Sequence, residues 1–263
     1  MKKLEYTFKS DILFKMTLVK HQRLLRRLVA EVLKIRVEDI QEFVVLNGEI
    51  VPEAIGKKFC RLDIHLKING EYVDVEMQVS NEGNFRERLL VYWSKVFAGA
   101  LGEGEDYREA ARTILISFVN FNLFNCAEYT SEFAVLEKRR YELLTDKMSI
   151  FVFELGKLPK QIDANNVLEL FLRAFRADTE EELENFENTG VAEMKEMITA
   201  YRDITSSPDY VDLERKRLMN RLDEGQALRH ARELAAEEER AKWQSEREAM
   251  AAEIARLRAQ LGE

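Results

Sequence analysis

Two alternating segments joined by Asn69-Gly70 constrain the fold of this chain more than any other feature of its sequence. In residues 61–68 and 71–79, apolar residues occupy every second position, which predicts two strands that each bury one face. Asn-Gly is the dipeptide favoured by a two-residue type I′ turn, because both of its residues adopt positive φ there. The sequence therefore predicts a tight β-hairpin.

A two-residue turn also fixes the pairing between the two strands. If Ile68 faces Glu71 across the turn, Asp63 faces Glu76, and both carboxylates lie on the polar face of the hairpin. Opposed side chains have Cβ atoms about 5 Å apart, and like charges at that distance destabilise the pair. The same register pairs two further sets of polar residues: Arg61 with Gln78, and His65 with Asp74 as an expected surface pair.

The opposed carboxylates allow two interpretations. A divalent cation such as Mg²⁺ would offset their repulsion, because hard cations bind carboxylate oxygens. Alternatively, the polar face is simply solvated, and Arg61 and Lys67 screen Asp63 and Glu76. The hairpin alone leaves both interpretations open.

Further short motifs lie on both sides of the hairpin. In chain order, with the hairpin's own, they are Ser10-Asp11-Ile12-Leu13-Phe14-Lys15, Lys58-Phe59-Cys60-Arg61-Leu62-Asp63, Asn69-Gly70, Glu76-Met77-Gln78, Phe85 to Arg88 with Tyr92 to Lys95, and Ile150 to Lys157. Their order resembles the PD-(D/E)XK nuclease superfamily. In particular, it is similar to the recombination-promoting nucleases, a family described as PD-(D/E)XK nuclease family transposases. The resemblance covers roughly residues 8–160.

This resemblance implies a Mg²⁺-dependent DNA endonuclease that promotes recombination or the transfer of mobile elements. It implies that Asp63 and Glu76 are metal ligands, and that Gln78 stands where the superfamily usually has a lysine. A glutamine can hydrogen-bond the attacking water or a phosphate oxygen, but it carries no charge. A Gln78→Lys variant is therefore expected to retain or raise activity.

Other residues enter the implied site with less definite roles. Lys58, Arg61 and Lys95 are the candidates to supply the positive charge that Gln78 lacks. These three residues, together with Arg88, are also the candidates for contact with DNA. Asp11 is a candidate for a further acidic contributor, although it also suits the positive end of a helix. A second hypothesis is that the nuclease fold is catalytically weak or inactive and acts as an oligomeric DNA- or protein-binding regulator.

Composition agrees with a soluble globular protein. Residues 1–160 hold 25 basic and 24 acidic residues, whereas residues 161–263 hold 15 and 24, so the acidic excess lies outside the nuclease-like part. No apolar run approaches the length of a membrane span, and no signal peptide is visible, which favours the cytoplasm. Cys60 and Cys126 show no metal-binding spacing.

The expected architecture is an α/β fold with a restriction-endonuclease-like αβββαβ core and a mixed sheet. The sequence predicts a helix over residues 10–35, strands near 41–46, 113–121 and 149–155, and a helix from 85 to 100. Residues 1–160 form the predicted nuclease-like domain, 161–208 a helical region, and 209–263 a long charged helix. In that helix, apolar heptad positions from Met250 onward suit a coiled-coil homodimer, but Arg240 and Arg247 interrupt the stripe, so a solvated single helix is the alternative.

Overall fold

The structure is a computed structural model that describes residues 2–46, 64–102, 104–161 and 163–261. Its contacts divide the chain into two compact units, Met1–Thr205 and Ser206–Glu263. The finer boundary expected at residue 160 remains a prediction.

The first unit is built on one six-stranded sheet, with strand order β1-β2-β3-β4-β6-β5. The strands are β1 Phe43–Val45, β2 Ile64–Ile68, β3 Glu71–Gln78, β4 Thr113–Val119, β5 Thr130–Phe133 and β6 Met148–Glu154. β1, β2 and β3 pair antiparallel, β3, β4 and β6 pair parallel, and β5 pairs antiparallel with β6. The predicted mixed sheet is confirmed, and β5 is an additional edge strand.

The hairpin adopts the predicted turn and register. Asn69 and Gly70 both have positive φ, at 48° and 83°, and Ile68 faces Glu71 while Ile64 faces Val75. The Asn69 side chain explains part of the turn's stability, because its Oδ1 accepts hydrogen bonds from the backbone N–H groups of residues 41 and 42 at 2.8 and 3.0 Å. The turn therefore also anchors the chain that leads into β1.

One face of the sheet packs against α1 Asp11–Lys20 and α4 Val167–Arg176, and α2 Gln22–Leu33 packs against these two helices. Phe118 of β4 is at the centre of this layer, with its ring centroid 6.0 Å from that of Phe14 in α1 and 5.3 Å from that of Phe175 in α4. The prediction of one continuous helix over 10–35 was wrong. The chain breaks at His21, where φ is −109° and ψ is 66°, and two shorter helices replace the single one.

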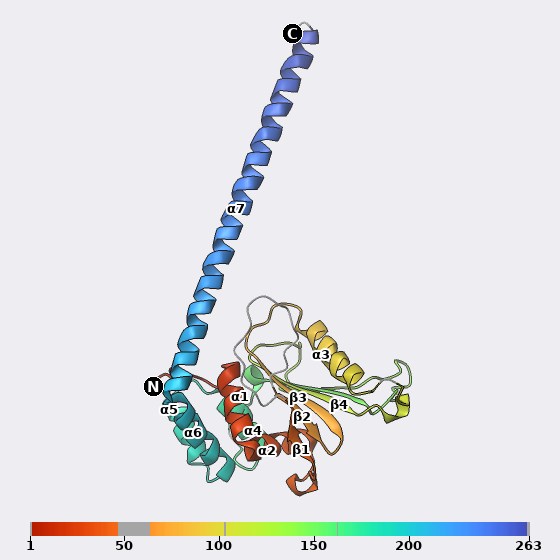
Figure 1. The fold of residues 1–263 in the computed structure, drawn as a ribbon, viewed down its shortest axis with the longest axis vertical. Helices are drawn as coiled ribbons and strands as arrows, with labels where there is room; N and C mark the ends of the chain where they lie inside the picture. Colours follow the sequence, from red (N-terminus) through yellow and green to blue (C-terminus); the bar gives the residue numbers. More distant parts are fainter. Residues whose placement is uncertain (1, 47–63, 103, 162, 262–263) are drawn as a thin grey trace. The chain divides into compact units, whose positions relative to one another are not determined.

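The other face is covered by α3 Phe85–Gly99, so the sheet lies between two helical layers (Figure 1). Phe85 and Leu89 of α3 pack on Leu115 and Val119 of β4. Further along the helix, the indole N–H of Trp93 donates a 2.9 Å hydrogen bond to the carbonyl of residue 113. These contacts hold α3 along β4.

Two further helices complete the first unit, α5 Glu180–Glu187 and α6 Ala192–Thr205. α5 begins with the capping box that Thr179 and Glu182 form, and α6 packs on α1. The Tyr201 hydroxyl in α6 donates a 2.7 Å hydrogen bond to the Tyr6 carbonyl, and burial raises the pKa of Tyr201 to about 12. Short 3-10 helices occupy Val37–Asp39, Tyr107–Glu109 and Leu155–Lys157.

The second unit is dominated by one helix, α7 Pro208–Leu261, of 54 residues. The predicted long C-terminal helix is thus confirmed. Its large apolar side chains at Trp243, Met250 and Ile254 are exposed. Among the described residues, no helix is both long and apolar enough to cross a membrane.

The Phe118 cluster generates a first prediction. Phe118→Ala should lower the free energy of unfolding by about 3–5 kcal/mol, because it removes a buried ring and leaves a cavity between sheet and helices. Urea denaturation would measure the loss. Tyr107→Ala is the matched control, because that ring is 87% exposed, and it should change stability by less than about 0.5 kcal/mol. Equal losses in the two variants would contradict this account of the core.

Candidate active site

The polar residues of β3 point toward α3. Alternate residues of a strand share a face, so Asp74, Glu76 and Gln78 lie on the same side of the sheet. Their parallel partners on β4 are Leu115, Ser117 and Val119. Leu115 and Val119 pack against α3, which places the two carboxylates and the amide in the layer between sheet and helix.

Both carboxylates of this face are buried. Asp74 is 0% exposed and Glu76 is 4% exposed, so a simply solvated polar face is the wrong interpretation for these two residues. Removing a carboxylate from water is costly unless charge or hydrogen bonds compensate it. The fold therefore places two buried carboxyl groups close together on the central strand.

His65 and Asp74 pair as the register predicts, but Asp74 is buried and His65 is only partly exposed, so this is not the expected surface pair. His65 Nδ1 lies 2.5 Å from Asp74 Oδ1, and the imidazole stacks on the Tyr72 ring at a centroid distance of 5.6 Å. Burial raises the pKa of Asp74, although the hydrogen bond and the charge of His65 act in the opposite direction. The burial follows from the position of β3 between β2 and β4, which strand alternation does not reveal.

Gln78 is held from two sides at the end of β3. Its Oε1 accepts a 2.6 Å hydrogen bond from a terminal guanidinium nitrogen of Arg88 in α3, and its Nε2 donates a 2.9 Å hydrogen bond to the Ser80 carbonyl. The Arg88 guanidinium carbon also lies 5.2 Å from the Phe85 ring centroid and 5.4 Å from that of Tyr92. Arg88 therefore lies half-buried against two rings and directly beside a predicted site residue.

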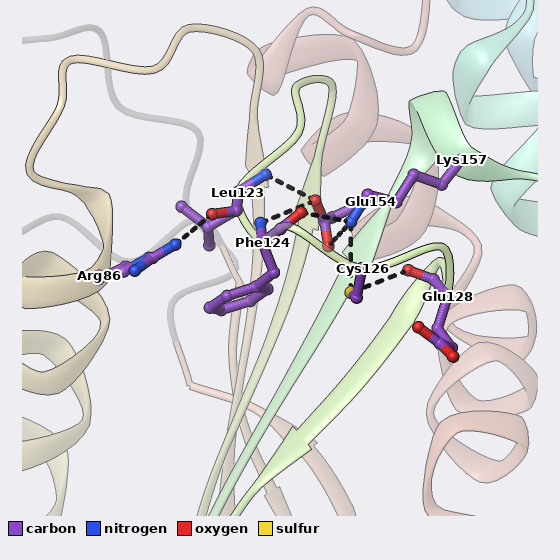
Figure 2. Close-up of polar contacts among 7 residues, drawn as sticks. All are labelled: Arg86, Leu123, Phe124, Cys126, Glu128, Glu154 and Lys157. Carbon is purple, nitrogen blue, oxygen red and sulfur yellow. Dashed lines mark hydrogen bonds and ion pairs between the residues drawn. The ribbon is translucent and has the colours of Figure 1, made fainter.

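The last of the sequence motifs forms a clamp on the loop that follows β4. The buried carboxylate of Glu154, at the end of β6, accepts hydrogen bonds from the N–H groups of Leu123 and Phe124 at 2.6 and 3.2 Å (Figure 2). Lys157 donates to Glu154 Oε2 and to the Phe124 carbonyl, both at 2.8 Å. Its amine also reaches Cys126 Sγ at 3.5 Å.

The charges in this clamp support one another. Burial lowers the pKa of the Lys157 amine, but the hydrogen bond and negative charge of Glu154, with a smaller effect of Cys126, raise it by more. From the side of α3, Arg86 donates a 2.5 Å hydrogen bond to the Leu123 carbonyl and lies over the Phe124 ring (Figure 2). The loop thus ties the first turn of α3 to the end of β6.

The structure brings together only some of the predicted site residues. Glu76 and Gln78 lie on one face of β3, and Arg88 joins them from α3. Lys95 is exposed on α3. Three predicted site residues, Lys58, Arg61 and Asp63, lie outside the described residues.

Asp11 lies at the start of α1. Ser10 is the N-cap residue, and its hydroxyl accepts from the N–H of Leu13, while Asp11 occupies the first turn. A carboxylate in the first turn is stabilised by the positive end of the helix. α1 packs on the sheet face opposite to Glu76, and a role of Asp11 in the site remains a prediction.

The chemistry of the described residues fits an oxygen-binding cation, although their set is incomplete. Within the described parts of the chain, no three His, Cys, Asp or Glu residues are grouped so that they could hold a metal ion. Glu76 nevertheless provides a buried carboxylate, and Ser117 beside it has a buried hydroxyl with no hydrogen-bond partner among the described residues. Buried oxygens of this kind suit Mg²⁺, which keeps several of its waters when bound.

The mixed sheet between two helical layers, with acidic residues on the central hairpin strand, is an α/β architecture of the nuclease type. The chain belongs to the PD-(D/E)XK nuclease family transposases, whose family model matches residues 3–231. This membership supports a role related to DNA cleavage or transposition. No curated protein and no solved structure matches the chain.

The clamp generates a second prediction. Glu154→Ala should destabilise the protein, because the N–H groups of Leu123 and Phe124 lose their acceptor, at about 1–3 kcal/mol for each. Urea denaturation would measure the change. Glu142→Ala is the matched control, because Glu142 pairs with Arg140 on the surface, where an ion pair contributes about 0–1 kcal/mol. A Glu154→Ala protein as stable as the control would show that the clamp is not structural.

Proposed function

We propose that the protein is a Mg²⁺-dependent DNA endonuclease in which Asp63 and Glu76 hold the metal. The observation that carries this proposal is the buried carboxylate of Glu76 on β3, in a hairpin whose described pairs follow the register predicted from Asn69-Gly70. Asp63 directly precedes β2, one residue before the first described pair of that register. The sequence motifs that resemble this family favour the same two residues.

Each site residue has a distinct task in this proposal. A bound Mg²⁺ supplies an acidified water and neutralises charge on the phosphate. Asp63 and Glu76 orient that ion, and the buried setting of Glu76 limits competition from bulk water. Gln78 donates a hydrogen bond to the attacking water or to a phosphate oxygen, which orients the reacting atoms.

Contact with DNA requires positive charge around this face of the sheet. We assign it to Lys58 and Arg61, which precede Asp63 in the chain, and to Lys95, which is exposed on α3. Such contacts to phosphates carry no sequence information and depend on salt concentration. The description of the family as transposases favours a biological role in recombination or the transfer of mobile elements.

The third prediction tests the metal site. Wild-type protein should nick or cut supercoiled plasmid with Mg²⁺ and should leave it intact in EDTA. Glu76→Gln and Asp63→Asn should each reduce cleavage by about 100-fold or more, because each removes a charged ligand of the ion. Gel electrophoresis of the plasmid over time would measure the rates.

Glu71→Gln is the matched control for these variants, because Glu71 begins the same strand but lies at its other end, 3.7 Å from Arg112. It should cleave like the wild type. Cleavage that persists in EDTA, or in Glu76→Gln, would refute the assignment. A wild type that binds DNA without cutting it would instead favour the inactive, regulatory form of the fold.

We further propose that α7 pairs two copies of the chain. Met250 and Ile254 are four residues apart on the helix, so their side chains lie on one stripe, and both are exposed. Pairing of two such helices would cover this stripe, and a dimer would supply one cleavage site for each DNA strand.

The fourth prediction addresses that dimer. The double variant Met250→Glu/Ile254→Glu should be monomeric at micromolar concentration, because it places four like charges in the proposed seam. Ala252→Glu is the control, since Ala252 lies between them on the far side of the helix, and it should stay dimeric. Size-exclusion chromatography with light scattering would measure the mass. A monomeric wild type would rule out pairing through α7.

A further inference from the structure

The candidate site contains a neutral amide where its superfamily usually has a charged amine, and an arginine lies against that amide. Gln78 Oε1 receives a 2.6 Å hydrogen bond from Arg88. A guanidinium stays protonated at any ordinary pH, so Arg88 brings a permanent positive charge to Gln78. The charge arrives from α3, ten residues further along the chain, rather than from the strand itself.

The two hydrogen bonds fix the orientation of the Gln78 amide. An arginine can only donate, so the atom that faces Arg88 has to be the amide oxygen. The Ser80 carbonyl can only accept, so the atom 2.9 Å from it has to be the amide nitrogen. One N–H of Gln78 is used by Ser80, and the second is the donor left for another group. A flipped amide would lose both contacts.

Arg88 is itself held in a defined position. Its guanidinium lies over the rings of Phe85 and Tyr92, and its Nε is buried with no hydrogen-bond partner in the described part of the chain. Phe85 is a core residue between α3 and β4. Arg88 is therefore held in place by residues packed between α3 and β4. Lys95, on the same helix, is exposed to solvent.

We propose that Arg88 is the positioning residue of this site and that it acts through Gln78. Arg88 orients the amide and polarises it, so that the second N–H of Gln78 becomes a stronger donor toward the scissile phosphate or the attacking water. Arg88 and Gln78 together thus perform the task of a single lysine. This inference rests on the proposed nuclease function, and it replaces the general DNA contact expected of Arg88 from the sequence.

The pair changes one expectation from the sequence. A Gln78→Lys variant was expected to retain or raise activity, but a lysine there would place its amine beside the half-buried Arg88 guanidinium. Two like charges in contact repel each other strongly in such a setting. The superfamily's lysine should therefore be tolerated at position 78 only when the charge at position 88 is removed.

The fifth prediction tests whether the positive charge can be moved from position 88 to position 78. Arg88→Gln should lower kcat for plasmid cleavage by about 100-fold with KM within about threefold of wild type, since it removes an interaction needed in the transition state. Gln78→Lys alone should lower kcat by about tenfold through repulsion. The double variant Gln78→Lys/Arg88→Gln should recover to within about threefold of wild type, above both single variants, because it restores one cation and one neutral partner.

Three controls separate this role from folding and from DNA binding. Arg108→Gln removes an arginine from an exposed 3-10 helix, where it pairs with Asp106, and should cleave like the wild type. Circular dichroism should show that every variant is folded. Fluorescence anisotropy with a labelled DNA duplex in EDTA should give dissociation constants for wild type and Arg88→Gln that agree within about threefold.

The outcomes distinguish this inference from the proposed function. A wild type that cuts no DNA with Mg²⁺ overturns the proposed function and this inference with it. A wild type that cuts, beside an Arg88→Gln variant that cuts equally well, overturns the inference alone. So does an Arg88→Gln variant whose loss of activity is matched by its loss of DNA affinity. If Arg88→Gln does not fold, the double variant decides, and a folded but inactive double variant overturns the inference.

Discussion

The burial of charged side chains on β3 is the constraint on which the rest of the first unit depends. Asp74 and Glu76 lie on a central strand with almost no exposure, and a strand with two buried carboxylates is costly to form unless its surroundings compensate them. His65 compensates Asp74 from β2. The aliphatic face of the same strand packs on the other helical layer, so β3 has a conventional core on one side and a polar site on the other.

The buried ion pair of Glu154 and Lys157 helps to fix the position of α3 beside that site. Glu154 and Lys157 bind both the N–H and the C=O groups of the loop after β4, and Arg86 binds the same loop from α3. Because Arg86 and Arg88 belong to the same helical turn, the contact between α3 and the loop also limits where Arg88 can lie. The Ile150 to Lys157 motif is thus structural, at the carboxyl end of β6, and supports the residues to which we assign catalysis.

The features that the sequence predicts correctly depend on neighbouring residues. The features that it does not predict depend on contacts between residues far apart in the chain. The hairpin was predictable because Asn69-Gly70 and the alternation are contained in adjacent residues. The break at His21 was not, because good helix formers flank it and tertiary packing decides the bend. β5 was missed because its short polar sequence pairs only through β6. The contact between Arg88 and Gln78 depends on how the chain turns between strand and helix, which no spacing reveals.

The position of Trp93 gives the protein a built-in optical reporter. The chain has two tryptophans, and they belong to different units: Trp93 is partly buried between α3 and β4, whereas Trp243 is exposed on α7. An indole in a less polar setting emits at shorter wavelength than one in water. In a Trp243→Phe protein, the tryptophan fluorescence would come from Trp93 alone, so it would follow the layer that bears Arg88 as DNA or metal is added.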